Sequence, residues 1–144
     1  MKTKKNSKTK KGIIDTYYNE IYEVYLAVAN EYATLKQLKD RYTFSDGVEL
    51  TDGILNGSCS TSTCKDKKTE AIVMLVKYNH ESYDKARERR TELVNIVSHE
   101  ATHVALDTYE LCGQNVCFCS PEPFCYLQAW AAERIYKTLT KWIT

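Results

Sequence analysis

Apolar residues recur every three or four positions from residue 13 to about residue 39, with polar residues between them. This spacing places the apolar side chains on one face of a helix, so it predicts a long amphipathic helix over 13–39. The apolar positions are Ile13, Tyr17, Ile21, Val24, Tyr25, Val28, Tyr32 and Leu35.

Strand signals dominate the middle of the chain. Between residues 41 and 68, three glycines separate short runs such as Val48 to Leu50, a pattern typical of strands joined by turns. Residues 70–78 form a nearly continuous apolar run that is rich in β-branched side chains. We therefore expect a buried strand there.

The last third of the chain is predominantly helical. Residues 82–111 contain neither proline nor glycine and carry apolar residues at helical spacing, which predicts a second long helix. Residues 112–120 indicate a loop, and a third helix should begin near Ser120, with Ser120 as its N-cap and Pro121 in the first helical position. The expected core face of this helix comprises Phe124, Leu127, Ala131, Ile135, Leu139 and Trp142.

These patterns predict an α+β fold in which an N-terminal helix, a small mixed sheet with an edge strand and two further helices follow one another. A chain of 144 residues can bury one core but is short for two, so we expect a single domain over 13–144. Residues 1–12 should form a flexible tail, because they carry six lysines and almost no apolar side chain. The lysines are Lys2, Lys4, Lys5, Lys8, Lys10 and Lys11.

Charge and hydropathy exclude several classes of protein. Twenty basic and nineteen acidic residues leave a net charge of +1, so the overall charge does not favour nucleic-acid binding. No apolar run approaches the roughly 18 residues of a membrane span. Acidic residues interrupt the stretch from Ile13 to Ala29, which therefore lacks the apolar core of a secretory signal. We expect a cytoplasmic protein without a signal peptide.

Six cysteines in a chain without an export signal favour reduced thiols over a disulfide framework. Four of them bracket the predicted loop before the third helix. They could form a structural zinc site, a redox-sensitive clamp or buried thiols, and we favour buried thiols because their spacings lack paired C-x-x-C motifs. The cysteines are Cys59, Cys64, Cys112, Cys117, Cys119 and Cys125.

The sequence His99-Glu100-Ala101-Thr102-His103 lies within the second long helix. Two histidines four residues apart project from the same helical face, so their imidazoles can reach a common tetrahedral ion. Glu100 would lie close enough to activate a water on that ion without being a ligand itself. The alternative is that both histidines are ordinary hydrogen-bonded side chains and that Glu100 is a solvated charge.

The chain resembles the zincin metallopeptidases, and His99, Glu100 and His103 are the residues that carry this resemblance. The resemblance implies a minimal zincin-like domain with one Zn²⁺ per chain and a peptide or protein substrate. In that superfamily an edge strand beside the motif helix takes up the substrate by strand addition. The specific motif is five residues long, although the expected order of elements agrees over residues 13–144.

The resemblance also suggests the third metal ligand. Metzincins would have glycine and histidine where this chain has Leu106 and Tyr109, so that branch is excluded. Gluzincins take a glutamate from a downstream helix, and Glu122 lies nineteen residues after His103. Its surroundings also resemble the Glu-Pro-x-x-Tyr helix start of small His-Glu-x-x-His proteins from bacteriophages and gut bacteria. We therefore predict His99, His103 and Glu122 as the zinc ligands.

Two other glutamates compete with Glu122. Glu133 lies about three helical turns further on and shares a face with Glu122, and we expect that face to meet the motif helix. Glu110 ranks third because it follows the motif too closely to fold back. The shared face also carries Tyr126, Ala129 and Tyr136. Tyr126 occupies the position at which larger gluzincins often have an aspartate that holds a ligand histidine.

The sequence thus predicts a zinc peptidase in which Glu100 is the general base. Tyr126, Tyr109 and His80 are possible donors to an oxyanion, although each is better explained as structural. The alternative is a zincin-fold structural or interaction protein without efficient catalysis, such as a phage virion component that binds a virion or host protein. No nucleic-acid or membrane partner is expected.

Overall fold

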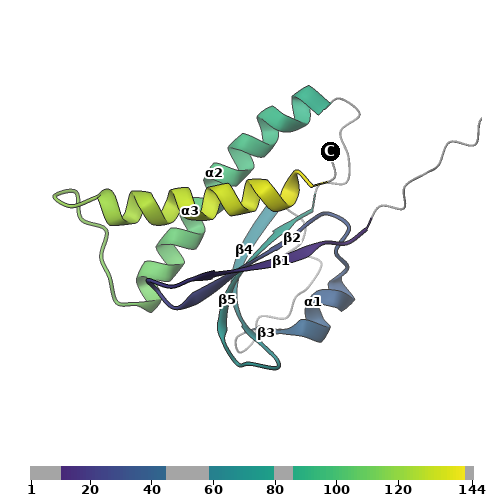
Figure 1. The fold of residues 1–144 in the computed structure, drawn as a ribbon, viewed down its shortest axis with the longest axis horizontal. Helices are drawn as coiled ribbons and strands as arrows, with labels where there is room; N and C mark the ends of the chain where they lie inside the picture. The colour runs from purple at the N-terminus through teal and green to yellow at the C-terminus, as the bar shows by residue number, and fades with distance from the viewer. Residues whose placement is uncertain (1–10, 45–58, 80–85, 142–144) are drawn as a thin grey trace, which may run out of the picture.

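The computed structural model describes residues 11–44, 59–79 and 86–141, so residues 1–10 of the expected tail lie outside it. In these ranges five strands form one mixed sheet and three helices pack around it, an α+β fold (Figure 1). No helix among the described residues is long and apolar enough to cross a bilayer. The elements are β1 (Ile14–Asn19), β2 (Val24–Ala29), α1 (Leu35–Arg41), β3 (Tyr42–Phe44), β4 (Cys59–Asp66), β5 (Ile72–Tyr78), α2 (Ala86–Leu111) and α3 (Glu122–Leu139).

The strand order in the sheet is β1-β2-β5-β4-β3. β2 and β5 are parallel, and the other neighbours are antiparallel. The strand predicted at 70–78 is confirmed as β5, and its central position explains its continuous apolar run, because both of its faces are buried. Strands are also confirmed within 41–68 as β3 and β4, whereas the run at 48–50 lies outside the described residues.

The helix predicted over 13–39 is wrong. β1 and β2 form an antiparallel hairpin there, and only α1 is helical. The Asn19 side chain accepts hydrogen bonds from the backbone N–H groups of Ile21 (3.0 Å) and Tyr22 (3.1 Å), and Glu23 has a φ of 53°, which no helix interior allows. The apolar spacing is misleading because β2 is buried along almost its whole length, so its run of apolar residues contains positions three and four apart without being helical.

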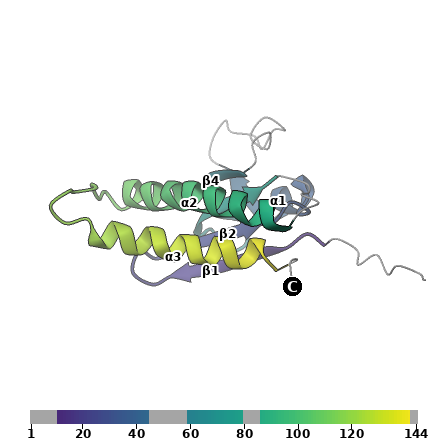
Figure 2. The ribbon, with the colours of Figure 1, turned by 90° about the horizontal axis from the view of Figure 1, so that it is seen from above.

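Helices cover both faces of the sheet. Successive residues of β5 point to opposite faces, so Met74 and Val76 join the core beneath α2 and α3, while Val73 and Leu75 join the core that includes Leu38 of α1. α2 contacts β4 and β5, and α3 contacts β1 and β2. Figures 1 and 2 show that the loop joining α2 to α3 projects away from the sheet, at the opposite end from α1.

The two long helices are confirmed, with one correction at the start of α3. α2 is helical from Ala86 to Leu111, and residues 112–121 form the expected loop. The N-cap of α3 is Pro121 rather than Ser120, because Pro121 already has near-helical dihedral angles (φ −81°, ψ −15°) and the chain enters the helix without a side-chain cap. Of the expected core face, Leu127, Ala131, Ile135 and Leu139 are buried, Phe124 is half-buried, and residue 142 is not described.

Candidate functional site

The His-Glu-x-x-His motif lies in the middle of α2, where its side chains divide between solvent and core. His99 and His103 are exposed, whereas Glu100 is only 5% exposed. Ala101 and Val104 belong to the core shared with the sheet and α3. Because successive residues are about 100° apart around a helix, a single turn presents the histidines outward and the carboxylate inward.

The two histidines are close enough to share one ion. The Nε2 atoms of His99 and His103 are 3.1 Å apart, and the rings meet edge to face with their centroids 4.8 Å apart. Two nitrogens bound to one tetrahedral zinc at about 2.0–2.1 Å lie about 3.3 Å from each other. The same contact is a hydrogen bond between the two imidazoles, so the spacing agrees both with hydrogen-bonded histidines and with two positions of a zinc site.

Glu100 is held against β4 by a residue that the motif does not contain. The Thr61 hydroxyl donates a hydrogen bond to Oε2 of Glu100. Side chains alternate along β4, so Thr61 shares the helix-facing side with Cys59 and with Thr63, whose hydroxyl donates to Sδ of Met74 (3.3 Å). A buried carboxylate is costly unless it is hydrogen-bonded, and Thr61 supplies one such bond.

Glu100 and His99 line a small cleft together with Cys59, Asn95 and Ile96. Its volume is ≈ 200 Å³, enough for water and a small part of a substrate. Burial raises the pKa of the Cys59 thiol, and the neighbouring Glu100 carboxylate raises it further. The thiol therefore stays protonated at neutral pH in the metal-free protein.

The expected acidic ligands lie on the solvent face of α3. Glu122 and Glu133 are exposed, as are the three residues predicted to share their face, so the expectation that this face meets the motif helix is wrong. The apolar stripe from Leu127 to Leu139 packs inward instead. Within the described ranges, no set of three His, Cys, Asp or Glu side chains is arranged to hold a metal. The structure thus joins His99 to His103 but does not bring Glu122, Glu133 or Glu110 to them.

The structure gives no support to the possible oxyanion donors among the described residues. Tyr109 is buried. The centroid of its ring lies 5.9 Å from the ring centroid of Tyr22 and 5.2 Å from that of Phe124. Tyr126 is 72% exposed, and residue 80 lies outside the described residues. A structural role therefore accounts for Tyr109.

Asp107 was not anticipated from the sequence. It lies one helical turn after His103, on the same side of α2. Burial raises the pKa of its carboxyl group, and the nearby His103 partly opposes that increase. The position four residues after the second histidine is the local signal that could have identified it.

The edge of the sheet next to the motif is formed by β4. β3 pairs with β4 only from Cys64 to Asp66. No other strand in the described part of the chain pairs with the outer side of β4 from Cys59 to Thr63, the segment that contains Thr61. Among the described residues, Cys59–Thr63 is therefore the segment with a free outer side that lies against the motif helix, and the strand predicted at 70–78 is central in the sheet.

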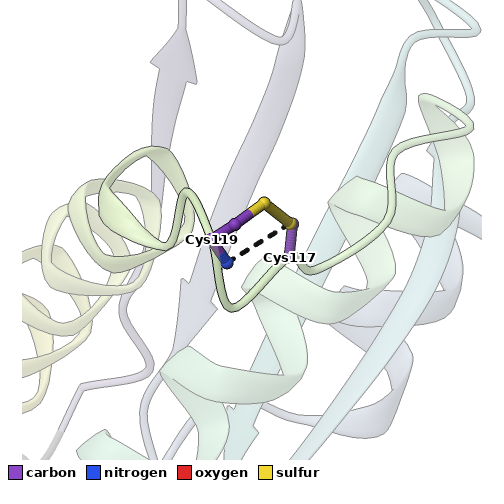
Figure 3. The surroundings of a disulfide bond; sticks show 2 residues. All are labelled: Cys117 and Cys119. Carbon is purple, nitrogen blue, oxygen red and sulfur yellow. Dashed lines mark hydrogen bonds between the residues drawn. A yellow bond between two sulfur atoms is a disulfide. The ribbon is translucent and has the colours of Figure 1, made fainter.

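The four cysteines in and beside the loop between α2 and α3 are not buried thiols. Cys117 and Cys119 form a disulfide (Figure 3). Cys112 and Cys125 are free and exposed. The expectation of buried thiols is therefore wrong here, because the loop projects beyond the sheet and has no core to enter, and the expectation of reduced thiols is wrong for Cys117 and Cys119. Of the other two cysteines, Cys64 is buried and Cys59 is half-buried.

Comparison of the chain with protein-family models, with curated proteins and with solved structures finds no match. The functional conclusion therefore depends on the residues and geometry described above.

Proposed function

We propose that this protein is a zinc-dependent peptidase. The observation that supports it best is that one turn of α2 exposes two histidines and buries the glutamate between them. An exposed histidine pair with 3.1 Å between its Nε2 atoms lies directly beside a carboxylate that is 5% exposed and hydrogen-bonded by Thr61. If the motif were a chance occurrence on a solvated helix, Glu100 would be expected to lie in water.

His99 and His103 would supply two of the zinc ligands, and Glu122 remains our proposed third. Because Glu122 lies apart from the histidines, binding in this way would require the exposed loop and the first turn of α3 to move toward α2. Bound zinc would act as a Lewis acid and lower the pKa of a water toward about 7.

Glu100 would act as the general base. Its carboxylate would accept a proton from the attacking water and later donate it to the nitrogen of the leaving amine. The hydrogen bond from Thr61 to Oε2 would fix the carboxylate in one orientation. The second oxygen would then be available to the water, because Glu100 lines the cleft beside His99.

The β4 edge suggests how a peptide would bind. A substrate strand added alongside Cys59–Thr63 would run past Thr61, the residue that touches Glu100. Backbone hydrogen bonds to an exposed edge bind an extended peptide with little dependence on its sequence. The scissile carbonyl would then lie between this edge and the histidine pair, so a peptide is the substrate class we propose.

One observation favours a second function. The described residues bring no acidic ligand to the histidine pair, as expected if the scaffold binds partners without efficient catalysis. In that case the protein would be a structural or interaction protein, and metal binding would be weak or without turnover.

The decisive experiment measures hydrolysis of a quenched fluorescent peptide library by the zinc-loaded protein. We expect the wild type to cleave peptides, and Glu100→Gln to lower the rate about 10²–10⁴-fold, the usual range for loss of a general base. Asp40→Asn is the matched control, since it removes an exposed carboxylate on α1, on the opposite face of the sheet. Zinc binding without cleavage by the wild type would support the non-catalytic alternative.

A further inference from the structure

The loop between α2 and α3 carries a disulfide between two exposed cysteines. Cys117 and Cys119 are bonded to each other across one intervening residue (Figure 3). That residue is Phe118, which is 100% exposed. Every residue from 111 to 123 is exposed. A thiolate in solution can therefore reach either sulfur of this bond.

This disulfide contributes little to the stability of the fold. The stabilisation from a cross-link grows with the length of chain that it closes, and a bridge across a single residue closes a very short loop. It joins no two elements, because both cysteines lie in the same turn of the loop, where the Ser120 N–H donates to the Cys117 carbonyl. Stabilisation of the fold therefore does not account for this disulfide.

The turn around the disulfide favours one direction of cleavage. The backbone N–H of Cys119 donates to Sγ of Cys117 (3.3 Å). A hydrogen bond of this kind stabilises a thiolate on Cys117 once the disulfide opens. Cys117 is thus the better leaving group, and Cys119 is the sulfur at which an incoming thiolate attacks.

We propose that the Cys117–Cys119 disulfide is a thiol–disulfide exchange site for cysteine pairs of polypeptides. Exposed disulfides are the labile ones and are frequently regulatory or catalytic. Phe118, the residue between the two cysteines in the sequence, and the exposed Val116 give the loop an apolar surface that favours an apolar polypeptide over a small hydrophilic thiol. This inference is independent of the zinc site.

The exchange is balanced in atoms and electrons. A substrate thiolate attacks Sγ of Cys119, a substrate–Cys119 disulfide forms, and the electron pair of the broken bond leaves on Cys117. The second substrate thiolate then attacks its own mixed disulfide, which releases the Cys119 thiolate, and both protein thiolates take up protons. The two cysteines gain two electrons, and the substrate pair becomes a disulfide.

The test uses the full chain with Cys112→Ser and Cys125→Ser, so that only the proposed site and the two sheet cysteines remain. The oxidised protein is mixed with a leucine-flanked peptide that contains two cysteines, with a serine-flanked version, or with glutathione. Samples are quenched in acid and alkylated, and the oxidation state of each cysteine is determined by mass spectrometry. Circular dichroism confirms that each variant is folded.

We expect the leucine-flanked peptide to become oxidised as Cys117 and Cys119 become reduced, roughly tenfold faster than the serine-flanked peptide, because it can bury part of Phe118. Phe118→Ser should remove the difference between the two peptides, because it removes the apolar side chain that the leucine-flanked peptide would bury. Cys117→Ser should accumulate glutathione on Cys119 after treatment with oxidised glutathione.

Three results would overturn the proposal. The disulfide could stay oxidised in the folded protein under excess peptide, or the two thiols could fail to pair in oxidised glutathione. Equal oxidation of the peptide by a variant that also carries Cys117→Ser and Cys119→Ser would show that other groups are responsible.

Discussion

Glu100 on α2 is packed against β4 and accepts a hydrogen bond from Thr61, whereas Glu122 on the first turn of α3 is exposed. Both glutamates belong to the chemistry that the sequence predicts, one as base and the other as metal ligand. The orientation of Glu100 follows from the packing of α2 on the sheet, because the face that buries Ala101 and Val104 also buries Glu100. The position of Glu122 instead depends on an exposed loop. A site that combines them would join a glutamate held against the sheet to a glutamate exposed at the start of α3.

Thr61→Val should produce the largest loss of stability among the variants that sharpen this comparison. It leaves the buried Glu100 carboxylate without its partner on β4, which costs about 1–3 kcal/mol of the free energy of unfolding. Thr63→Val is the matched control on the same face of β4, and we expect it to cost less than about 1 kcal/mol, because a sulfur is a weak acceptor. Urea unfolding of both variants measures the difference, and equal losses would contradict the assigned role of Thr61.

Phe124→Ala tests how the start of α3 is attached. Phe124 is half-buried and its ring lies edge to face with that of Tyr109, so truncation should cost about 1–2 kcal/mol, less than for a fully buried phenylalanine. Tyr126→Ala, on the exposed face beside Glu122, should change the stability by less than about 0.5 kcal/mol. Thermal unfolding compares the two. A larger loss of stability in Tyr126→Ala than in Phe124→Ala would show that the face of α3 with Glu122 and Tyr126 packs against the rest of the protein.

Asp107→Asn should give the smallest effect, and that effect should depend on pH. Burial raises the folded-state pKa of Asp107 above its ordinary value of 3.8, so the protonated carboxyl stabilises the fold. This contribution is complete below about pH 3.8 and is lost as the pH rises through the folded-state pKa. In zinc-free protein, Asp107→Asn should therefore gain stability relative to the wild type between acidic and neutral pH. A constant difference across that range would contradict the shift.

Part of the fold could be predicted from the sequence. β5 and α2 are long segments with an unbroken pattern, and both are confirmed within a few residues of their expected ends. The N-terminal hairpin could not be predicted from the sequence. A strand buried on both faces has apolar residues at nearly every position, including positions three and four apart. The turn that separates β1 from β2 depends on Asn19 and on the left-handed conformation of Glu23, which no apolar pattern reveals.

Only those residues of the site that lie close together in the sequence were predictable. His99, Glu100 and His103 belong to one helical segment, so their spacing alone indicates their chemistry. Thr61 precedes Glu100 by 39 residues, and only the tertiary packing of β4 against α2 brings them together. The prediction of which face of α3 packs inward was wrong. The face with Glu122 and Glu133 and the apolar face repeat with the same helical period, and burial of the apolar residues decides which face turns toward the core.

The most direct test of the account is the zinc content of the purified protein, measured by elemental analysis after dialysis in chelator-free buffer. The wild type is compared with His103→Ala, Glu122→Ala and Glu133→Ala. We predict one zinc per chain, loss of zinc in His103→Ala, and loss in Glu122→Ala but not in Glu133→Ala. A wild-type protein without zinc, or zinc that persists in His103→Ala, would contradict the proposed metal centre.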